Sequence, residues 1–477
     1  MLDKILVLDT DSYGSIAIAR KLRGQGIYSK ILPGNAPLEA VVEQNASGII
    51  WAGRAEGDTP PVDERILSLG LPVLALGSAA VALARMLGGF SEGAALTNTT
   101  ATVNYDAAQL VFDEMAPGDR WFARAERLTL PDCAMSIASV NGVAVGFCDK
   151  ERPLYGLQFL IEKHDPEGVA LLNNFCAKIS RCTPWWSTEA FIDRATGELA
   201  RLADGAPLVV ALSGGVDSAV CAALASRAVG SRLIPIMVRT GLHRSADIEK
   251  HAEAFCRQNL GVELTVADAR QKVFESLDGV SDAAAKAEAV RGVFRSAVLE
   301  AAGPNAAGMT LVLGANYSEI LQNNHSARQQ SDFQGFKGVV EPLVELFKDE
   351  VRAVGERLGL PTAFVNMQPI AIEGLAARIE GVVSESLVET LRAADAILRE
   401  EIETGGQDKR LRQYYAVLAK QISDSAYTLA LMALTTGDKA GAARLPYDLL
   451  ERVVERVRHN LPSIGRVVYD LTPSLTT

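Results

Sequence analysis

The stretch from Pro207 to Arg227, PLVVALSGGVDSAVCAALASR, places a short polar loop between two segments of different character. The apolar run 207–212 predicts a buried β-strand, and the alanine-rich run 219–227 predicts a helix. Two adjacent glycines allow the loop to turn tightly and to expose consecutive backbone N–H groups. The helix adds the positive end of its dipole, so the loop predicts an anion site, most naturally for a pyrophosphate. The residues expected to surround the anion are Ser213, Gly214, Gly215, Val216, Asp217 and Ser218.

Side chains of this loop extend the prediction. The hydroxyl groups of Ser213 and Ser218 can donate hydrogen bonds to phosphate oxygens, and Asp217 either caps the helix or helps to hold Mg²⁺. The loop lacks the Gly-Lys-Ser/Thr ending of a Walker loop, and an ordinary strand–turn–helix connection is the alternative. It resembles the PP-loop of ATP pyrophosphatases, which split ATP into AMP and pyrophosphate while they adenylate a substrate. The resemblance implies ATP and Mg²⁺ as cofactors and catalytic roles for Asp217 and Ser218.

Length and composition limit the remaining possibilities. A chain of 477 residues is too long for one ordinary core, and 48% hydrophobic with 22% charged residues is typical of globular domains. The net charge of −11 argues against a nucleic-acid partner. The six cysteines form no Cys-x-x-Cys pair, which argues against a zinc site or a disulfide framework. The longest apolar run, 71–84, is too short to cross a bilayer, and the start is unlike a signal peptide. We therefore expect a cytoplasmic protein without a membrane partner.

The first part of the chain alternates expected strands and helices, as in a layered α/β domain that becomes richer in strands from Ala101. The order of elements resembles a class I glutamine amidotransferase domain, as found at the front of GMP synthetases. That family carries a cysteine in a Gly-x-Cys-x-Gly turn and a histidine in a Tyr-Gly-x-Gln-Phe-His-Pro-Glu segment. Here the cysteine position falls on Gly77 and the histidine position on Leu160, while Glu162 of the triad remains. Strands are expected at 4–8, 48–51, 73–76, 134–140, 143–148 and 154–159, and helices at 16–23 and 79–87.

These replacements predict the loss of one activity. Amide hydrolysis by this fold needs a thiolate that a histidine base makes nucleophilic, and Gly77 and Leu160 supply neither group. Ser78 follows the cysteine position, but without a base its hydroxyl group would be inert. We therefore expect a retained scaffold without glutaminase activity, in which Glu162 is a solvated or structural carboxylate.

A second α/β pattern begins with the strand before the loop 213–218. Ligands of parallel sheets bind at the carboxyl ends of strands, so Val238 and Arg239, at the end of the next strand, are expected to contact the adenosine of ATP. Asp268 ends a third strand, where a role at this site and a role as a helix N-cap are equally good explanations. The strands expected after the first are 233–238, 262–267 and 310–313.

The end of the fourth strand resembles the Gly-Thr-x-Tyr-Pro-Asp segment of GMP synthetases. Gly314 and Tyr317 match it, and Glu319 replaces its aspartate. The match implies that Gly314 contacts ATP and that Glu319, with Asp217, serves as a Mg²⁺ ligand.

The segment 341–352, EPLVELFKDEVR, is nearly that of GMP synthetases. Lys348 and Arg352 lie four residues apart and share one face of the expected helix. Lys348 is expected to reach a phosphate as a catalytic residue, and a solvated helix face is the alternative. A linker with Trp185 and Trp186 precedes the second pattern, and we expect the two rings to pack rather than to bind a ligand.

From Leu360 onward the chain resembles the dimerisation domain of GMP synthetases, which implies a homodimer. The resemblances together predict an α/β protein of three domains. A degenerate class I amidotransferase-like domain spans 1–182, and a PP-loop domain with a parallel sheet, of the adenine nucleotide alpha hydrolase-like type, spans 183–358. A small α+β dimerisation domain spans 359–477. The segments that carry the last resemblance are 392–397, 445–452 and 466–470.

The elements that hold the acceptor nucleotide in GMP synthetases are altered. The glycine- and proline-rich family loop reads QPIAIEGLA at 368–376, the loop 331–337 is shortened, and the lysine-bearing terminal tail is replaced by LTPSLTT. A substrate phosphate needs charge-assisted donors, so the acceptor site is expected to be rebuilt. We expect an ATP-dependent ligase that adenylates a small, purine-nucleotide-like acceptor for attack by ammonia, another amine or sulfur, with ammonia or sulfur coming free or from a donor protein.

Three alternatives stay open at this point. The first is a plain GMP synthetase that uses ammonia directly. The second is a sulfur-transferring enzyme, for which Cys221 is the nearest thiol, although its alanine-rich helix favours a core position. The third is a non-catalytic regulatory protein that retains nucleotide affinity.

Overall fold

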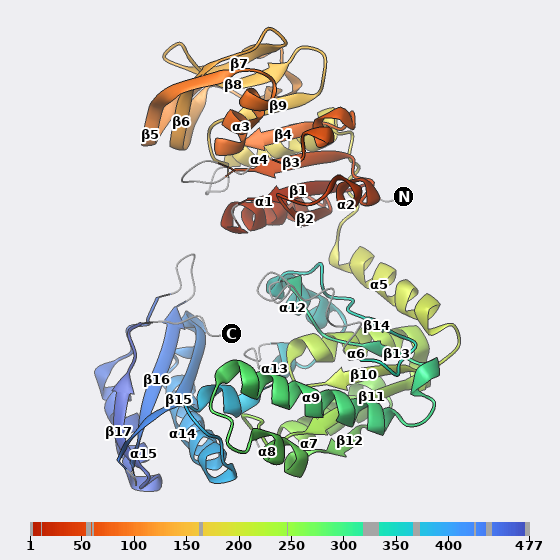
Figure 1. The fold of residues 1–477 in the computed structure, drawn as a ribbon, viewed down its shortest axis with the longest axis vertical. Coiled ribbons are helices and arrows are strands. Elements are labelled where there is room, and N and C mark those ends of the chain that lie inside the picture. Colours follow the sequence, from red (N-terminus) through yellow and green to blue (C-terminus); the bar gives the residue numbers. More distant parts are fainter. Residues whose placement is uncertain are drawn as a thin grey trace. The chain divides into compact units, whose positions relative to one another are not determined.

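The computed structural model describes residues 3–10, 12–53, 59, 62–161, 166–245, 247–317, 333–365, 373–423, 426–435 and 441–472. The chain divides into two compact units, Met1–Phe191 and Ile192–Thr477, and each is described by itself (Figure 1). The predicted domain boundaries after residues 182 and 358 stay predictions. In the described ranges, no helix is both long enough and apolar enough to cross a membrane.

The first unit is built on one mixed sheet of nine strands in the order β2-β1-β3-β4-β9-β8-β7-β5-β6 (Figure 1). Pairing is parallel from β2 to β9 and antiparallel from β9 to β6. The strands are β1 (Ile5–Asp9), β2 (Ser29–Pro33), β3 (Gly48–Ala52), β4 (Val73–Leu76), β5 (Phe90–Tyr105), β6 (Gly118–Thr129), β7 (Ala134–Val140), β8 (Val143–Asp149) and β9 (Leu154–Leu157). The helices are α1 (Ser12–Gly24), α2 (Leu38–Glu43), α3 (Ser78–Met86) and α4 (Pro166–Asn173), with short helical segments η1 (Glu64–Ser68), η2 (Leu110–Phe112) and η3 (Asn174–Ile179).

The parallel half of this sheet follows directly from the sequence. Strands such as β3 are apolar and buried along their whole length, as expected where helices cover both faces. The β5–β6 hairpin was not predicted: no strand was expected between 77 and 133, and most residues of β5 are at least partly exposed. Trp185 and Trp186 pack against Tyr28 with ring centroids 5.3 and 5.0 Å apart, as predicted.

The second unit contains a parallel sheet of five strands in the order β12-β11-β10-β13-β14 (Figure 1). Helix α9 and the neighbouring α8 pack on one face of this sheet, while α6 and α12 pack together on the other. The strands are β10 (Leu208–Leu212), β11 (Leu233–Arg239), β12 (Thr265–Asp268), β13 (Thr310–Val312) and β14 (Gly338–Val340). The helices are α5 (Thr188–Ala203), which crosses the boundary between the units, α6 (Val216–Val229), α7 (Ile248–Phe255), α8 (Arg270–Leu277), α9 (Ala283–Ala302), α12 (Lys348–Arg357) and α13 (Thr362–Val365). Short helical segments are η4 (Gly230–Arg232), η5 (Cys256–Leu260) and η6 (Ala306–Gly308).

The last part of the second unit is a small α+β layer. Its sheet has the order β15-β16-β17, antiparallel between the first two strands and parallel between the last two. One continuous apolar core joins this layer to the parallel sheet, because residues of α14 and β15 pack together with residues of β11 and α9. The elements are η8 (Gly374–Arg378), α14 (Glu385–Thr404), η9 (Asp408–Arg410), β15 (Leu411–Ser423), β16 (Ala426–Thr435), α15 (Tyr447–Asn460) and β17 (Ile464–Tyr469).

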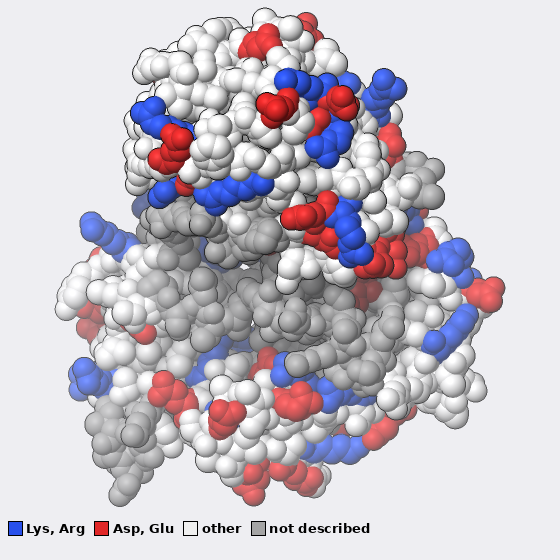
Figure 2. Space-filling view, turned by 45° about the horizontal axis from the view of Figure 1, so that its top comes forward, with Lys and Arg blue, Asp and Glu red and all other residues white. Residues whose placement is uncertain are grey.

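The charged side chains of the described surface are mixed in sign. On the face drawn in Figure 2, Lys and Arg residues lie among Asp and Glu residues rather than in one broad basic area.

Candidate functional site

The loop between β10 and α6 turns as tightly as its glycines predict. Gly214 has a φ of 82°, a left-handed conformation that favours glycine, and a Cβ atom there would overlap the side chain of Ile248. Helix α6 begins at Val216, earlier than the expected 219, so Asp217 and Ser218 belong to its first turn. Their backbone N–H groups are among those that an α-helix leaves without intrahelical partners, and they are available to an anion.

The two serine hydroxyl groups of the loop bond within it. Ser218 Oγ accepts from the backbone N–H of Ser213 (3.2 Å) and donates to Gly215 O (3.0 Å). Ser213 Oγ accepts from the N–H of Gly215 at 3.3 Å. The hydroxyl groups therefore hold the shape of the loop, and the backbone N–H groups are its main donors toward a phosphate.

Lys348, the first residue of α12, reaches the loop. Its Nζ forms an ion pair with Asp217 Oδ2, and the side chains of Lys348 and Asp217 are 22% and 14% exposed. The alternative of a solvated helix face for Lys348 is therefore wrong. Asp217 is not the N-cap either, because that position belongs to Gly215.

The second carboxylate oxygen of Asp217, Oδ1, is a candidate metal ligand. This oxygen is buried and accepts no hydrogen bond from the described residues. A buried carboxylate oxygen without a donor is costly unless a cation or an N–H group completes it, and carboxylate oxygen is a preferred Mg²⁺ ligand. The residue therefore fits the predicted role at Mg²⁺, while the second predicted ligand, Glu319, lies outside the described residues.

Gly314 brings the end of β13 against the first turn of α6. A Cβ atom at this position would lie 2.8 Å from Ser218 N, 2.9 Å from Asp217 C and 3.1 Å from Ser218 Cα. All three are backbone atoms of the helix, so a side chain cannot be accommodated by a rotamer change. The close approach places Gly314 beside the loop 213–218, and its role in ATP binding stays a prediction.

The end of β11 is shaped by ion pairs. Val238 is 2% exposed and belongs to the apolar core, so only its backbone is available to a ligand. Arg239 bonds Glu249 Oε2 (2.7 Å) and Asp268 Oδ2 (3.0 Å), and these bonds, that of Glu249 above all, raise the pKa of Arg239. Asp268 also bonds Arg270, whose side chain contributes most to the lowered pKa of Asp268. The N-cap of α8 is Ala269, so Asp268 serves as the partner of two guanidinium groups.

Glu341 has a partly buried carboxyl group at the end of β14 and was not among the predicted site residues. It directly follows β14, the neighbour of β13, and the N–H of Leu313 bonds to Val340 O at 3.0 Å. Burial raises the pKa of Glu341 from its ordinary 4.5 to about 7, and its Oε1 has no hydrogen-bond partner among the described residues. Its position directly after a strand in a recognisable segment was the available signal.

The first unit contains a second strand–turn–helix connection, between β4 and α3. Gly77 occupies the turn with φ 60° and ψ −130°, a strained conformation for any other residue and the type found at nucleophile elbows. Gly53, at the end of β3, packs on this turn and donates its N–H to Leu76 O (3.0 Å). Ser78 Oγ bonds the hydroxyl group of Thr59, Leu160 is 8% exposed, and Glu162 lies outside the described residues.

Comparison with known proteins then identifies the family. A family model described as NAD synthase matches residues 198–408, which include the loop, β11 and β13. A GMP synthase (glutamine-hydrolyzing) of Acetivibrio thermocellus is 33% identical over 497 residues, which cover 98% of this chain and 97% of that protein. The chain belongs to the GMP synthase family. GMP synthases (glutamine-hydrolyzing) of Caldicellulosiruptor saccharolyticus and Thermomicrobium roseum are also 33% identical, each over 98% of this chain and over 97% and 95% of their own length.

As a member of the GMP synthase family with a PP-loop domain, the protein is an ATP-dependent ligase of the ATP pyrophosphatase type. Among solved structures, a glutamine amidotransferase from Thermotoga maritima covers 38% of this chain and 99% of its own at 15% identity, with a TM-score of 0.31. The α/β fold class expected from the GMP synthase resemblance agrees with the family model and with the sheets of the two units. The structure brings Asp217, Ser218, Gly314 and Lys348 together, places Arg239 at the end of the neighbouring strand, and leaves Glu319 undescribed.

Proposed function

We propose that this GMP synthase family member adenylates a small, purine-nucleotide-like acceptor and that an external nucleophile then displaces AMP. In the first step an acceptor oxygen attacks the α-phosphorus of ATP, and pyrophosphate leaves. In the second step the nucleophile, ammonia in the simplest case, attacks the acceptor carbon that bears this oxygen, and AMP leaves with the oxygen. The observation that carries the proposal is the ion pair of Lys348 with Asp217 at the first turn of α6, beside the loop of backbone donors.

The roles of the residues follow from their chemistry. The backbone N–H groups of 215–218 would bind the pyrophosphate part of ATP, and Lys348 would balance the negative charge that grows on it as it leaves. Mg²⁺, when bound, neutralises phosphate charge, and Asp217 Oδ1 with Glu319 would hold it. Val238 and Arg239 would contact the adenosine, the former through its backbone.

The first unit is proposed to lack glutaminase activity, in contrast to what the names of the curated relatives state for those proteins. Gly77 keeps the conformation of an elbow, but it offers no nucleophilic atom, and Leu160 offers no base. Ammonia would therefore be taken from solution or from a separate donor protein. We also propose that the protein acts as a homodimer in the cytoplasm, as the resemblance of residues 359–477 implies.

Two other functions are weighed against specific observations. A sulfur-transferring enzyme needs an accessible thiolate, whereas Cys221 is fully buried and its Sγ lies 3.4 Å from Leu313 O. A regulatory protein without turnover would need no buried carboxylate oxygen held ready at the loop, as Asp217 Oδ1 is. Both observations favour the ligase.

The test is pyrophosphate release from Mg·ATP with xanthosine monophosphate or other purine nucleotides, in the presence of ammonium or of glutamine, with Asp217→Ala as the control. Release with xanthosine monophosphate and ammonium, but not with glutamine, would identify an ammonia-dependent GMP synthetase. Release with another acceptor alone would identify a ligase of changed specificity. Measurable ATP binding without release under any condition would refute the ligase and support the regulatory function.

A further inference from the structure

The turn that follows β11 is bonded by residues that come much later in the chain. Three consecutive carbonyl groups, those of Gly241, Leu242 and His243, accept hydrogen bonds from the segment that begins the C-terminal layer. Leu375 N donates to Leu242 O at 2.8 Å. Arg392 donates to the other two, from Nη2 to Gly241 O (2.6 Å) and from Nε to His243 O (2.9 Å). Residues of the C-terminal layer thus complete the backbone bonding of the turn.

Arg392 is well suited to hold this turn. It lies on α14, its side chain is 16% exposed, and its Nη1 forms an ion pair with Glu389. The guanidinium plane presents donors in a rigid fork, so one side chain can bond two carbonyl groups that are two residues apart only if the backbone curls around it. Burial, and then the charge of Arg392, lower the pKa of His243 to about 4. The imidazole beside the guanidinium is therefore neutral at neutral pH.

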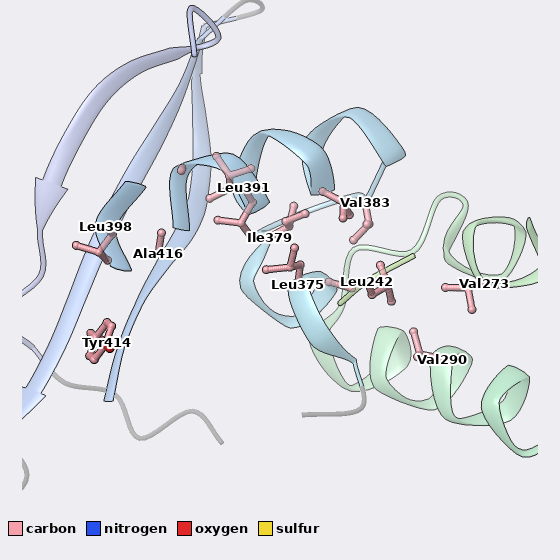
Figure 3. Close-up of a cluster of buried hydrophobic side chains, with 14 of the residues drawn as sticks. Leu242, Val273, Val290, Leu375, Ile379, Val383, Leu391, Leu398, Tyr414 and Ala416 are labelled. Carbon is pink, nitrogen blue, oxygen red and sulfur yellow. The ribbon is translucent and has the colours of Figure 1, made fainter. Parts of the chain in front are cut away.

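Neighbouring contacts fix the two sides of the turn. Leu242 is fully buried and packs with Leu375 in the cluster that Figure 3 shows. Arg244, buried as well, bonds Asp395 Oδ1 (3.2 Å) and Tyr414 O (2.8 Å). These contacts secure the position of the turn, whereas the two bonds of Arg392 set the orientation of its peptide groups.

We infer that Arg392 is a positioning residue for nucleotide binding, which holds the turn after β11 in the shape that Mg·ATP requires. The inference rests on the proposed function, which places the adenosine against Val238 and Arg239, immediately before this turn. The sheet fixes one end of the connection, because Arg239 O accepts from Ala269 N at 3.0 Å. Arg392 fixes the other end, so its loss would let the peptide groups between the two ends rotate away from the adenosine.

The test compares Arg392→Met with Arg392→Lys and with the control Arg456→Met. Arg456 also belongs to the C-terminal layer and also pairs with α14, through Glu400 (2.6 Å) and Glu401 (2.8 Å), but its bonds lie away from the turn. Titration calorimetry with Mg·α,β-methylene-ATP measures affinity in the full chain, and hydrogen exchange of peptides from 240–245 reports on the turn. Pyrophosphate release separates KM for ATP from kcat.

We expect Arg392→Met to bind the nucleotide at least tenfold more weakly, with a raised KM, a kcat changed less than threefold, and faster exchange in the turn. Arg392→Lys, which keeps the charge but not the rigid fork of donors, should lie between this variant and the wild type, and Arg456→Met should bind as the wild type does. Unchanged binding by Arg392→Met, or equal weakening by Arg392→Met and Arg456→Met, would overturn the inference. Absence of binding to the wild-type protein would overturn the proposed function itself, and the inference with it.

Discussion

Replacing Gly314 by alanine should displace the start of α6 and distort the proposed anion-binding loop. The added Cβ would lie 2.8 Å from Ser218 N and 2.9 Å from Asp217 C, where ordinary contact begins at about 3.4 Å. The neighbours are backbone atoms of α6, so the start of the helix must move by roughly half an ångström. Overpacking of this kind costs about 1–3 kcal/mol of unfolding free energy. Because a misplacement of about 1 Å can cost a hundredfold in rate, a loss of roughly tenfold in pyrophosphate release is expected as well.

Gly215→Ala is the matched control for this substitution. Gly215 has φ −84° and ψ 164°, which any residue adopts, and the atom nearest to an added Cβ is Ser213 Oγ at 3.5 Å. A glycine replaced at a compatible position leaves stability unchanged or raises it by up to about 1 kcal/mol. The two variants therefore add the same methyl group at two ends of one site, with opposite expected effects on stability.

The assay can separate the two units of the chain. All four tryptophans, at positions 51, 121, 185 and 186, lie in the first unit, so tryptophan fluorescence in urea should show the same transition for both variants and the wild type. Hydrogen exchange of peptides from α6 and far-ultraviolet circular dichroism should show a less stable second unit in Gly314→Ala alone. Equal protection of α6 in Gly314→Ala and Gly215→Ala would refute the steric argument.

Three further predictions concern other groups. Asp217→Asn and Lys348→Met should each lower kcat/KM for pyrophosphate release by about a hundredfold. The double variant should be little worse than either single variant, because the two side chains act as a pair. Additive losses in the double variant would contradict this. Gly77→Cys should cost about 1–3 kcal/mol, since Gly77 has φ 60°, and should release no ammonia from glutamine, because Leu160 supplies no base; glutamine hydrolysis by this variant would contradict the assignment. Glu341 has a pKa raised from 4.5 to about 7, so its stabilising protonated form is complete below about pH 4.5 and is lost as the pH rises through 7. A glutamine at this position cannot ionise, so the variant Glu341→Gln should lose less stability than the wild type between pH 5 and 8, by roughly 1–2 kcal/mol once partial exposure is allowed for. Urea midpoints measured across this pH range would show the difference, and parallel pH profiles of variant and wild type would contradict it.

The sequence predicted the elements whose signal is local. The strands β10, β11 and β13 are apolar runs bounded by polar residues, and they agree with the expected ranges to within one residue at each end. Helix α6 starts three residues earlier than expected. The composition of Val216-Asp217-Ser218 is typical of a turn, but the bond from Ser218 Oγ to Gly215 O stabilises a helical first turn. β5 is poorly predicted, since its exposed threonines and alanines carry no clear periodicity.

The contacts that make the site are not local, which is why the sequence could not predict them. Lys348 and Asp217 are 131 residues apart in the sequence, and no pattern of residues around either one specifies the pair. The acidic partners of Arg239 come from α7 and from the end of β12, so only the folded structure shows that this guanidinium group is already ion-paired within the protein. Glu341 could have been suspected from its place after a strand, but its burial depends on packing that the sequence does not display.

The two strand–turn–helix connections would explain why we propose that one activity is lost and the other is retained. At Gly77 an amidotransferase nucleophile would be a side-chain atom, so the backbone can keep the shape of an elbow without the group that the reaction needs. At residues 213–218 the chemistry of anion binding resides in backbone N–H groups and a helix terminus, which depend on the shape alone. Under the proposed function, glycine would remove the nucleophile at the first turn and permit anion binding at the second, because it supplies conformation without functional groups.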